Sequence, residues 1–408
     1  MGIQITKLKS VNYLTGSIFI FLSTMPWVGL PFLDSQPWPV LAALLFLFIN
    51  TISLPRNSKL PRMAVVLVWL VIFGLIVGSL MGVQNNFILY RGIINYISIA
   101  LFIIAFYQYF KLYGFPLKIL VFSNIIWVVI ALIQLFMPEI VSSFVASRTT
   151  VGRGVTSLAP EPTFFAIYLF FSSWLILLGT KYKPEKKLRF LLICNLLSIL
   201  LLAKSSMVVL YLAIVVSILI LKKMSFSVKS LKFVFTIILI FVLVYMGITN
   251  FMPNTRIANL LKLMATIDPV ALIRIDASIN ERFASVIVPI QGFIQNLGIP
   301  GGLHSFDRVA ADIVASYGEY FKYSNLQLRI MSWNGALFYE LGFFGIIIWI
   351  LLFNELLNGT KQRRYELVVL FIILFSAIPL AFPLIPMLFT VLYHSKSYSF
   401  EKLFILNK

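Results

Sequence analysis

Residues 148–162 form a polar stretch in a largely apolar chain, and they combine residue types that could do chemistry. Arg148 and Arg153 are followed by Glu161, which stands between two prolines directly before an apolar run. A guanidinium has fixed donors that match phosphate oxygens, and the glycines that flank Arg153 let the backbone approach a ligand closely. The stretch therefore predicts an anion-binding site, with a solvated loop as the alternative.

Glu161 has three candidate roles. The prolines on either side fix the backbone, and the apolar run from Thr163 can begin a helix whose positive N-terminal end faces the carboxylate. The carboxylate could act as a general base, pair with one of the arginines, or have only a structural role where the helix starts. Residue chemistry alone leaves these three roles open.

Two further basic residues, Arg91 and Lys204, lie in or beside apolar runs. A charge at the membrane face is costly unless its side chain reaches the interface or lines a polar cavity, so each is a candidate substrate-binding residue. The alternative is that both residues anchor their helices at the interface.

A second polar segment lies later in the chain. Asp276 and Arg282 are six residues apart on an expected helix, which is followed by a glycine-rich turn at 298–302 and then by His304. Histidine suits proton transfer near neutral pH, so Arg282 and His304 are candidate catalytic residues and Asp276 is a candidate binding residue. A surface histidine is the alternative for His304. Arg329, in the same segment, is a further candidate for substrate binding.

The composition indicates that a polytopic membrane protein must position these residues. Of 408 residues, 60% are hydrophobic and 12% are charged, and the mean hydropathy is +0.98. With one cysteine, Cys194, and two histidines, the sequence predicts neither a disulfide framework nor a metal site. It contains no nucleotide-binding loop, and we expect no cofactor.

The net charge of +19 follows from membrane topology, so we expect no nucleic acid as a partner. Basic loops alternate along the chain, and the positive-inside rule makes these loops and the N-terminus cytoplasmic. The two long outer loops are 138–162, with the Glu-Pro motif, and 253–332. The second loop has seven basic and six acidic residues. It predicts a folded outer subdomain with helices near 259–264 and 278–290 that lie on the membrane.

The whole chain, 1–408, is predicted to be a single all-α integral membrane domain with about 10–12 transmembrane helices, since each span needs roughly 20 apolar residues. The stretch 367–393 is interrupted by three prolines and predicts a tight or re-entrant hairpin. The other apolar runs of sufficient length lie near 13–32, 38–54, 63–82, 87–110, 117–137, 163–180, 188–203, 206–221, 231–252 and 333–353.

Two segments resemble a known family. Residues 153–165, RGVTSLAPEPTFF, resemble the arginine and Glu-Pro segment of Wzy-type bacterial polysaccharide polymerases, and residues 334–345, NGALFYELGFFG, resemble a span start shared with O-antigen ligases. Lys204-Ser205-Ser206 is similar to the short basic-serine turn of this superfamily, and the segment from Asp276 to Gly302 is similar to its large outer loop. Ligases typically have a histidine where this chain has Trp333, which favours a polymerase.

The resemblance implies a GT-C-like glycosyltransferase in the cytoplasmic (inner) membrane of a bacterium. It would polymerise undecaprenyl-diphosphate-linked oligosaccharide repeat units on the outer face, for O-antigen, capsule or exopolysaccharide. Membrane lipid and a regulator of chain length would be its partners. In the site that the resemblance implies, the diphosphate is bound by Arg148, Arg153, Lys204 and Arg282. Glu161 or His304 accepts the proton of the acceptor hydroxyl. Arg91, Asp276 and Arg329 also bind the substrate.

Two alternatives to a polymerase remain. An O-antigen ligase would transfer finished polymer to another acceptor. A flippase for lipid-linked oligosaccharides belongs to a different class, and it should have charges distributed through several spans. The gathering of charges in the outer loops of this chain disfavours a flippase.

Overall fold

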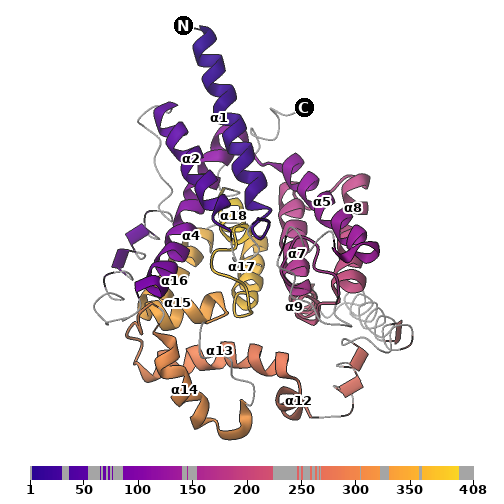
Figure 1. The fold of residues 1–408 in the computed structure, drawn as a ribbon, viewed down its shortest axis with the longest axis vertical. Coiled ribbons are helices and arrows are strands. Elements are labelled where there is room, and N and C mark those ends of the chain that lie inside the picture. Colours follow the sequence, from indigo (N-terminus) through magenta and orange to yellow (C-terminus); the bar gives the residue numbers. More distant parts are fainter. Residues whose placement is uncertain are drawn as a thin grey trace. The chain divides into compact units, whose positions relative to one another are not determined.

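The computed structural model is mostly helical in the residues it describes, with no β-strand among them and one isolated bridge between Ser332 and Ala377 (Figure 1). This confirms the predicted all-α architecture for those residues. The described residues are 2–29, 36–53, 65, 68–69, 72–73, 76, 86–139, 145, 154–223, 246–247, 250, 258–259, 262–263, 266, 268–303, 305–321, 330–357 and 361–394.

Three helical segments of the described chain are long and apolar enough to cross a bilayer, namely Gly92–Tyr113, Leu117–Phe136 and Pro162–Gly179. They match the predicted spans near 87–110, 117–137 and 163–180. Shorter apolar helices accompany them, so the chain is a membrane protein. The predicted spans near 63–82 and 231–252 lie mainly outside the described residues.

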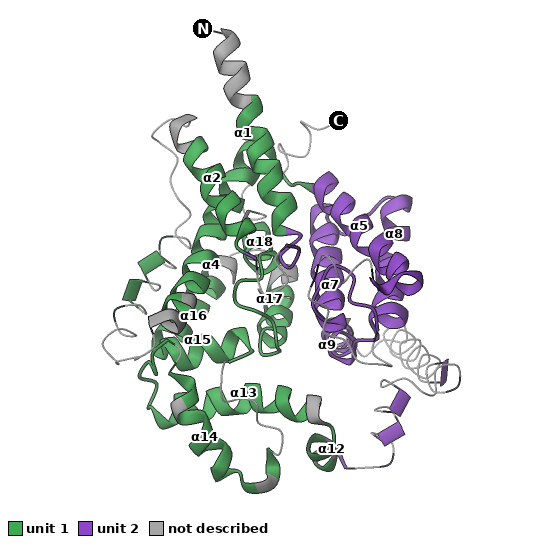
Figure 2. Cartoon of the chain, viewed as in Figure 1, with its two compact units in different colours: residues 1–23, 37–116, 270–408 green, residues 24–36, 117–269 purple. Residues whose placement is uncertain are grey.

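The chain divides into two compact units (Figure 2), of which unit 1 is made of residues 1–23, 37–116 and 270–408. In this unit α1 packs against α2 and α4, α4 packs against α18, and α13 packs against α14 and α15. Phenylalanine rings in contact join α1 to α4, with 4.8 Å between the ring centroids of Phe19 and Phe106 and 37° between their planes. The helices are α1 (Gly2–Ser23), α2 (Trp38–Ser53), α4 (Asn86–Tyr113), α12 (Pro269–Ile275), α13 (Ala277–Gln295), α14 (Phe306–Ser316), α15 (Trp333–Leu341), α16 (Phe343–Leu357), α17 (Lys361–Ile373) and α18 (Leu384–His394).

Unit 2 is made of residues 24–36 and 117–269. Its helices are α5 (Leu117–Phe136), α7 (Pro162–Gly179), α8 (Lys186–Leu197), the π-helix η1 (Ser198–Ala203) and α9 (Ser206–Lys223). The core is aromatic, because the fully buried Trp127 of α5 stacks on Tyr168 of α7 at a centroid distance of 4.1 Å. The helix α7 also packs against α8, η1 and α9, and therefore stands at the centre of this unit.

The single span predicted near 333–353 is wrong, because the chain breaks at Gly342 into α15 and α16. Gly342 has φ +55°, and a Cβ there would meet the Gly298 carbonyl oxygen. The next residue, Phe343, donates its backbone N–H to the same Gly298 carbonyl at 2.9 Å. Apolar content alone could not reveal this break, since glycine also occurs within continuous membrane helices.

The predicted outer subdomain has a folded core. A buried cluster joins α13, α14 and α15 through Val288, Phe306, Ile313 and Tyr339. The helix expected near 278–290 is confirmed as part of α13, whereas α14 was not predicted. The helix expected near 259–264 falls mainly outside the described residues. The proline-interrupted stretch 367–393 contains the end of α17, a non-helical segment and α18.

Asn334 joins three helices of unit 1 through its fully buried side chain. Its Nδ2 donates to the Phe371 carbonyl oxygen at 2.7 Å, and its Oδ1 accepts from Nε1 of Trp349 at 3.0 Å. In an apolar interior no water can take the place of the Asn334 amide as hydrogen-bond partner of these two groups. Asn334 therefore holds α15 to α16 and α17.

We expect Asn334→Ala to lower the free energy of unfolding by about 1–2 kcal/mol, because it leaves the Trp349 N–H and the Phe371 carbonyl unpaired. Thermal unfolding of the detergent-purified protein measures this loss. Asn354→Ala is the matched control, because Asn354 is an exposed asparagine on α16. Equal melting temperatures for the two variants would contradict the role of Asn334.

Candidate functional site

The segment 154–161, which holds the Glu-Pro motif, is fixed to α5 by buried hydrogen bonds. The Gln134 side chain accepts from the backbone N–H groups of Thr156 at 3.0 Å and Ser157 at 2.7 Å, and it donates to the Thr156 hydroxyl at 2.9 Å. The Ser157 hydroxyl donates to the Trp127 carbonyl oxygen at 2.7 Å. Thr156 and Ser157 are fully buried, so this part of the motif is a rigid part of unit 2.

The same segment lies directly against the end of η1. The Val155 N–H donates to the Leu202 carbonyl at 2.9 Å. A Cβ on Gly154 would clash with the carbonyl oxygens of Leu202 and Ala203. These clashes exclude any side chain unless the backbone moves. Gly154 is therefore required for the close approach of the motif to the residue that follows η1, which is Lys204.

Lys204 occupies an unusual backbone conformation. It follows the π-helix and has φ 50° and ψ 39°, in the left-handed region that an L-residue with a side chain rarely adopts. Short π-helical segments and strained backbone concentrate at functional sites. The side chain is half-buried, and among the described residues its ammonium has no hydrogen-bond or ion-pair partner.

Ser205 adds a second unpaired group to this turn. It is only 4% exposed, and within the described part of the chain its hydroxyl has no hydrogen-bond partner. A buried hydroxyl usually finds one, because its desolvation is otherwise uncompensated. Lys204 and Ser205 together therefore offer a cation and a hydroxyl donor that no described residue engages.

Glu161 precedes α7 as its N-cap residue, with Pro162 in the first turn of the helix, as the sequence predicts. Its carboxylate makes no capping hydrogen bond, and the side chain is half-buried. The backbone carbonyl of Glu161 accepts from Phe164 and Phe165 and so starts the helix. The carboxylate therefore lies at the helix start without a capping hydrogen bond, and its three candidate roles stay predictions.

Glu161 and Lys204 lie at the same end of one helical hairpin. The helix α7 runs to Gly179, the chain turns at 180–185, and α8 with η1 returns along α7. The hydrogen bond from Val155 to Leu202 confirms that the motif and the end of η1 meet there. This end of the hairpin combines a carboxylate, a cation and a hydroxyl that no described residue engages, a set that can bind an anion and accept a proton.

Unit 1 holds the second group of predicted residues. Asp276 is the N-cap of α13, and its Oδ1 accepts from the Ile279 N–H at 2.8 Å. Arg282 lies half-buried on the same helix. The glycine turn after α13 is fixed to α15, because the Gly301 N–H donates to the Tyr339 carbonyl at 2.8 Å and the Gly302 N–H to that of Glu340 at 3.3 Å.

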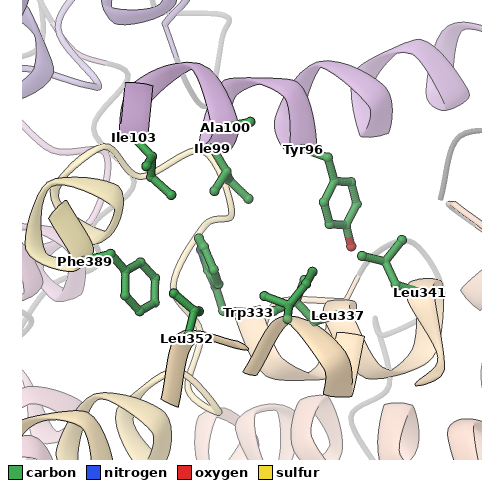
Figure 3. A pocket seen from close by; sticks show the side chains of 10 residues that line it. Tyr96, Ile99, Ala100, Ile103, Trp333, Leu337, Leu341, Leu352 and Phe389 are labelled. Atoms are coloured by element: carbon green, nitrogen blue, oxygen red, sulfur yellow. The ribbon is translucent and has the colours of Figure 1, made fainter. Parts of the chain in front are cut away.

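Glu340 was quoted in the sequence motif but given no site role, and the structure pairs it with Tyr96. The Tyr96 hydroxyl of α4 donates to Oε2 of Glu340 at 2.6 Å, and both side chains are buried. Tyr96 also lines a narrow apolar cavity between α4, α15, α16 and α18 (Figure 3), with Trp333 and Leu337 on the facing side. Two sequence signals bear on Glu340, its place in the 334–345 motif and its position inside an apolar run, and neither indicates Tyr96 as its partner.

Several predicted residues fall outside the described part of the chain. These are Arg148, Arg153, His304 and Arg329, and for Arg91 only the position in α4 is described. The structure brings Gly154, Glu161 and Lys204 to one end of a hairpin, and it places Asp276 and Arg282 on α13. Among the described residues no three His, Cys, Asp or Glu side chains gather to hold a metal ion.

Comparison with known proteins gives no relative. The chain matches no family model, no curated protein and no solved structure.

We expect Lys204→Gly to be more stable than Lys204→Ala by about 1 kcal/mol, because glycine adopts the left-handed conformation without a Cβ clash. Thermal unfolding compares the two variants. Lys181 is the matched control, because it also has a positive φ, 51°, but is exposed beyond the end of α7. Its Gly and Ala variants should differ in the same direction. Equal stability of Lys204→Gly and Lys204→Ala would contradict the strained conformation.

We expect Tyr96→Phe to reduce stability by about 1–3 kcal/mol, because it leaves the buried Glu340 carboxylate without this donor. Tyr90→Phe is the control on the same helix, because Tyr90 is 60% exposed. The double variant Tyr96→Phe/Glu340→Gln should lose less than the sum of the single losses, as contacting residues do. Additive losses in the thermal melts would show that the two side chains do not interact.

Proposed function

We propose that the chain is a polysaccharide polymerase, a glycosyltransferase that joins undecaprenyl-diphosphate-linked oligosaccharide repeat units on the outer face of a bacterial cytoplasmic membrane. The observation that carries this proposal is the Lys204-Ser205 turn beside the Glu-Pro segment, whose cation and hydroxyl have no partner among the described residues. A diphosphate is the anionic group of a lipid-linked sugar donor, and such a turn suits it.

The proposed reaction is a displacement at the anomeric carbon of the growing chain. A hydroxyl oxygen of the incoming unit forms the new glycosidic bond to this carbon. The bond from the carbon to the diphosphate oxygen breaks, and its electron pair leaves with undecaprenyl diphosphate. The hydroxyl proton passes to the Glu161 carboxylate, which acts as the general base.

Lys204 would stabilise the negative charge that develops on the departing diphosphate. A fixed cation contributes most where its surroundings are apolar and already organised, because no solvent has to reorient during the reaction. The backbone that holds Lys204 is fixed on both sides, by η1 before it and by α9 after it. Ser205 would donate a hydrogen bond to the same group.

The remaining predicted residues enter the proposal through the sequence alone. Arg148, Arg153 and Arg282 would add bidentate contacts to diphosphate, which a guanidinium makes better than an ammonium. His304 is the alternative proton acceptor. Arg91, Asp276 and Arg329 would contact the sugar units or their carrier, with Asp276 limited to its second carboxylate oxygen while the first caps α13.

A comparison of four strains tests the proposal: the parent, a deletion strain, and deletion strains that carry either Lys204→Gly or Lys181→Gly. Glycans are analysed by gel and mass spectrometry. Deletion should leave single repeat units on the acceptor in place of a ladder. Lys204→Gly should keep the fold but slow chain growth by about 100-fold, the typical loss when one charge-stabilising group is removed, whereas Lys181→Gly should restore the ladder.

Other outcomes would overturn the proposal. A full-length ladder that stays on undecaprenyl diphosphate after deletion would mean an O-antigen ligase. Repeat units trapped on the cytoplasmic face would mean a flippase. A normal ladder with Lys204→Gly would remove Lys204 from the site, even if deletion abolished the ladder.

A further inference from the structure

The turn that ends α13 has an exposed apolar surface. Ile294, Leu297 and Ile299 are 56%, 79% and 53% exposed. Leu297 has φ 52°, so a large apolar side chain is held outward by a backbone conformation that an L-residue rarely adopts. We call these three residues the turn patch. In a water-exposed loop such a patch would be an unfavourable surface.

The turn patch continues the exposed face of α16. Phe343, Ile347 and Ile350 are spaced three and four residues apart, so they share one side of the helix, and they are 54%, 40% and 59% exposed. The Phe343 N–H donates to the Gly298 carbonyl, and a Cβ on Gly298 would clash with the Phe343 ring. The turn therefore lies directly against the first residue of this helix.

The helix α16 is too short to cross a bilayer without its neighbours. Its 15 residues span about 22 Å at 1.5 Å per residue, whereas the hydrocarbon core is about 30 Å thick. If α16 reaches one edge of the core, about 8 Å of hydrocarbon remain beyond Phe343. The helix α15 precedes Phe343 in the chain, and the turn after α13 is hydrogen-bonded to α15.

The backbone of the turn is suited to a place without water. Irregular backbone is tolerated in hydrocarbon only when its polar groups are paired within the protein. Every backbone N–H group from 296 to 302 donates to a carbonyl oxygen inside unit 1, and Pro300 has no N–H group. In the view of Figure 1, α13 runs across the direction of α1.

From these observations we infer that the turn patch is immersed in the hydrocarbon of the lipid bilayer and covers α15 there. Residues 294–299, which the sequence assigns to an aqueous outer loop, would then lie at membrane depth. The helix α15, with Asn334 and Glu340, is consequently an intramembrane element. This inference goes beyond the proposed function and does not depend on it.

The test places a nitroxide spin label on the full-length protein in phosphatidylcholine vesicles, in a Cys194→Ser background because Cys194 is the one cysteine. Leu297→Cys and Ile299→Cys carry the label in the turn patch. Ile350→Cys is the hydrocarbon reference, and Asp312→Cys, exposed on α14, is the aqueous reference. Collision rates with oxygen, which concentrates in lipid, and with a water-soluble nickel chelate measure the depth of each label.

The expected result is that labels at 297 and 299 lose collisions with the nickel chelate and gain collisions with oxygen, as at 350. Nickel accessibility equal to that at 312 would overturn the inference. Protection from both reagents, with dipolar broadening between labels, would also overturn it and would indicate a second copy of the chain on the patch. Ile299→Cys keeps the test decisive if the strained position 297 does not tolerate cysteine.

Discussion

Pairing of polar groups inside the protein is the constraint on which the rest of this structure depends. In hydrocarbon, a backbone or amide group without a partner costs more than most packing contacts contribute. Gln134 meets the constraint for the Glu-Pro segment by pairing with two of its N–H groups and one hydroxyl. Asn334 meets it for the joint of α15, α16 and α17. One amide side chain in each unit thus fixes the position of a segment that the hydrophobic effect alone would not specify.

This fixation makes the strained positions stable. Ser157 and Lys204 both have positive φ values, which cost about 1–2 kcal/mol each. Ser157 keeps its conformation because its N–H and its hydroxyl are both bonded to α5. Lys204 keeps its conformation because η1 ends there and α9 begins two residues later. Strain persists where the surroundings over-determine it, and here the surroundings are rigid helices.

The sequence predicted what depends on local pattern. Apolar length located α4, α5 and α7, and the prolines beside Glu161 located the start of α7 within one residue. It could not predict what depends on partners distant in the chain. The helix breaks at Gly342, where the Phe343 N–H donates to the Gly298 carbonyl. Glu340 is buried with a donor, the hydroxyl of Tyr96, which is 244 residues away in the sequence. The contacts of Gly154 with η1 are non-local in the same way.

The polar residues inside apolar runs were nevertheless visible, and they separate into two kinds. Gln134, Asn334 and Glu340 each engage a partner elsewhere in their unit, so their role is to position other segments. Lys204 and Ser205 have no such partner among the described residues. An unpaired cation beside an unpaired buried hydroxyl in a membrane protein is a candidate binding site, with an interface anchor as the alternative for Lys204. A ligand from outside the chain that supplies an anion would offset the cost of both groups, so we propose the turn after η1, rather than the paired residues of α15, as the place of the substrate.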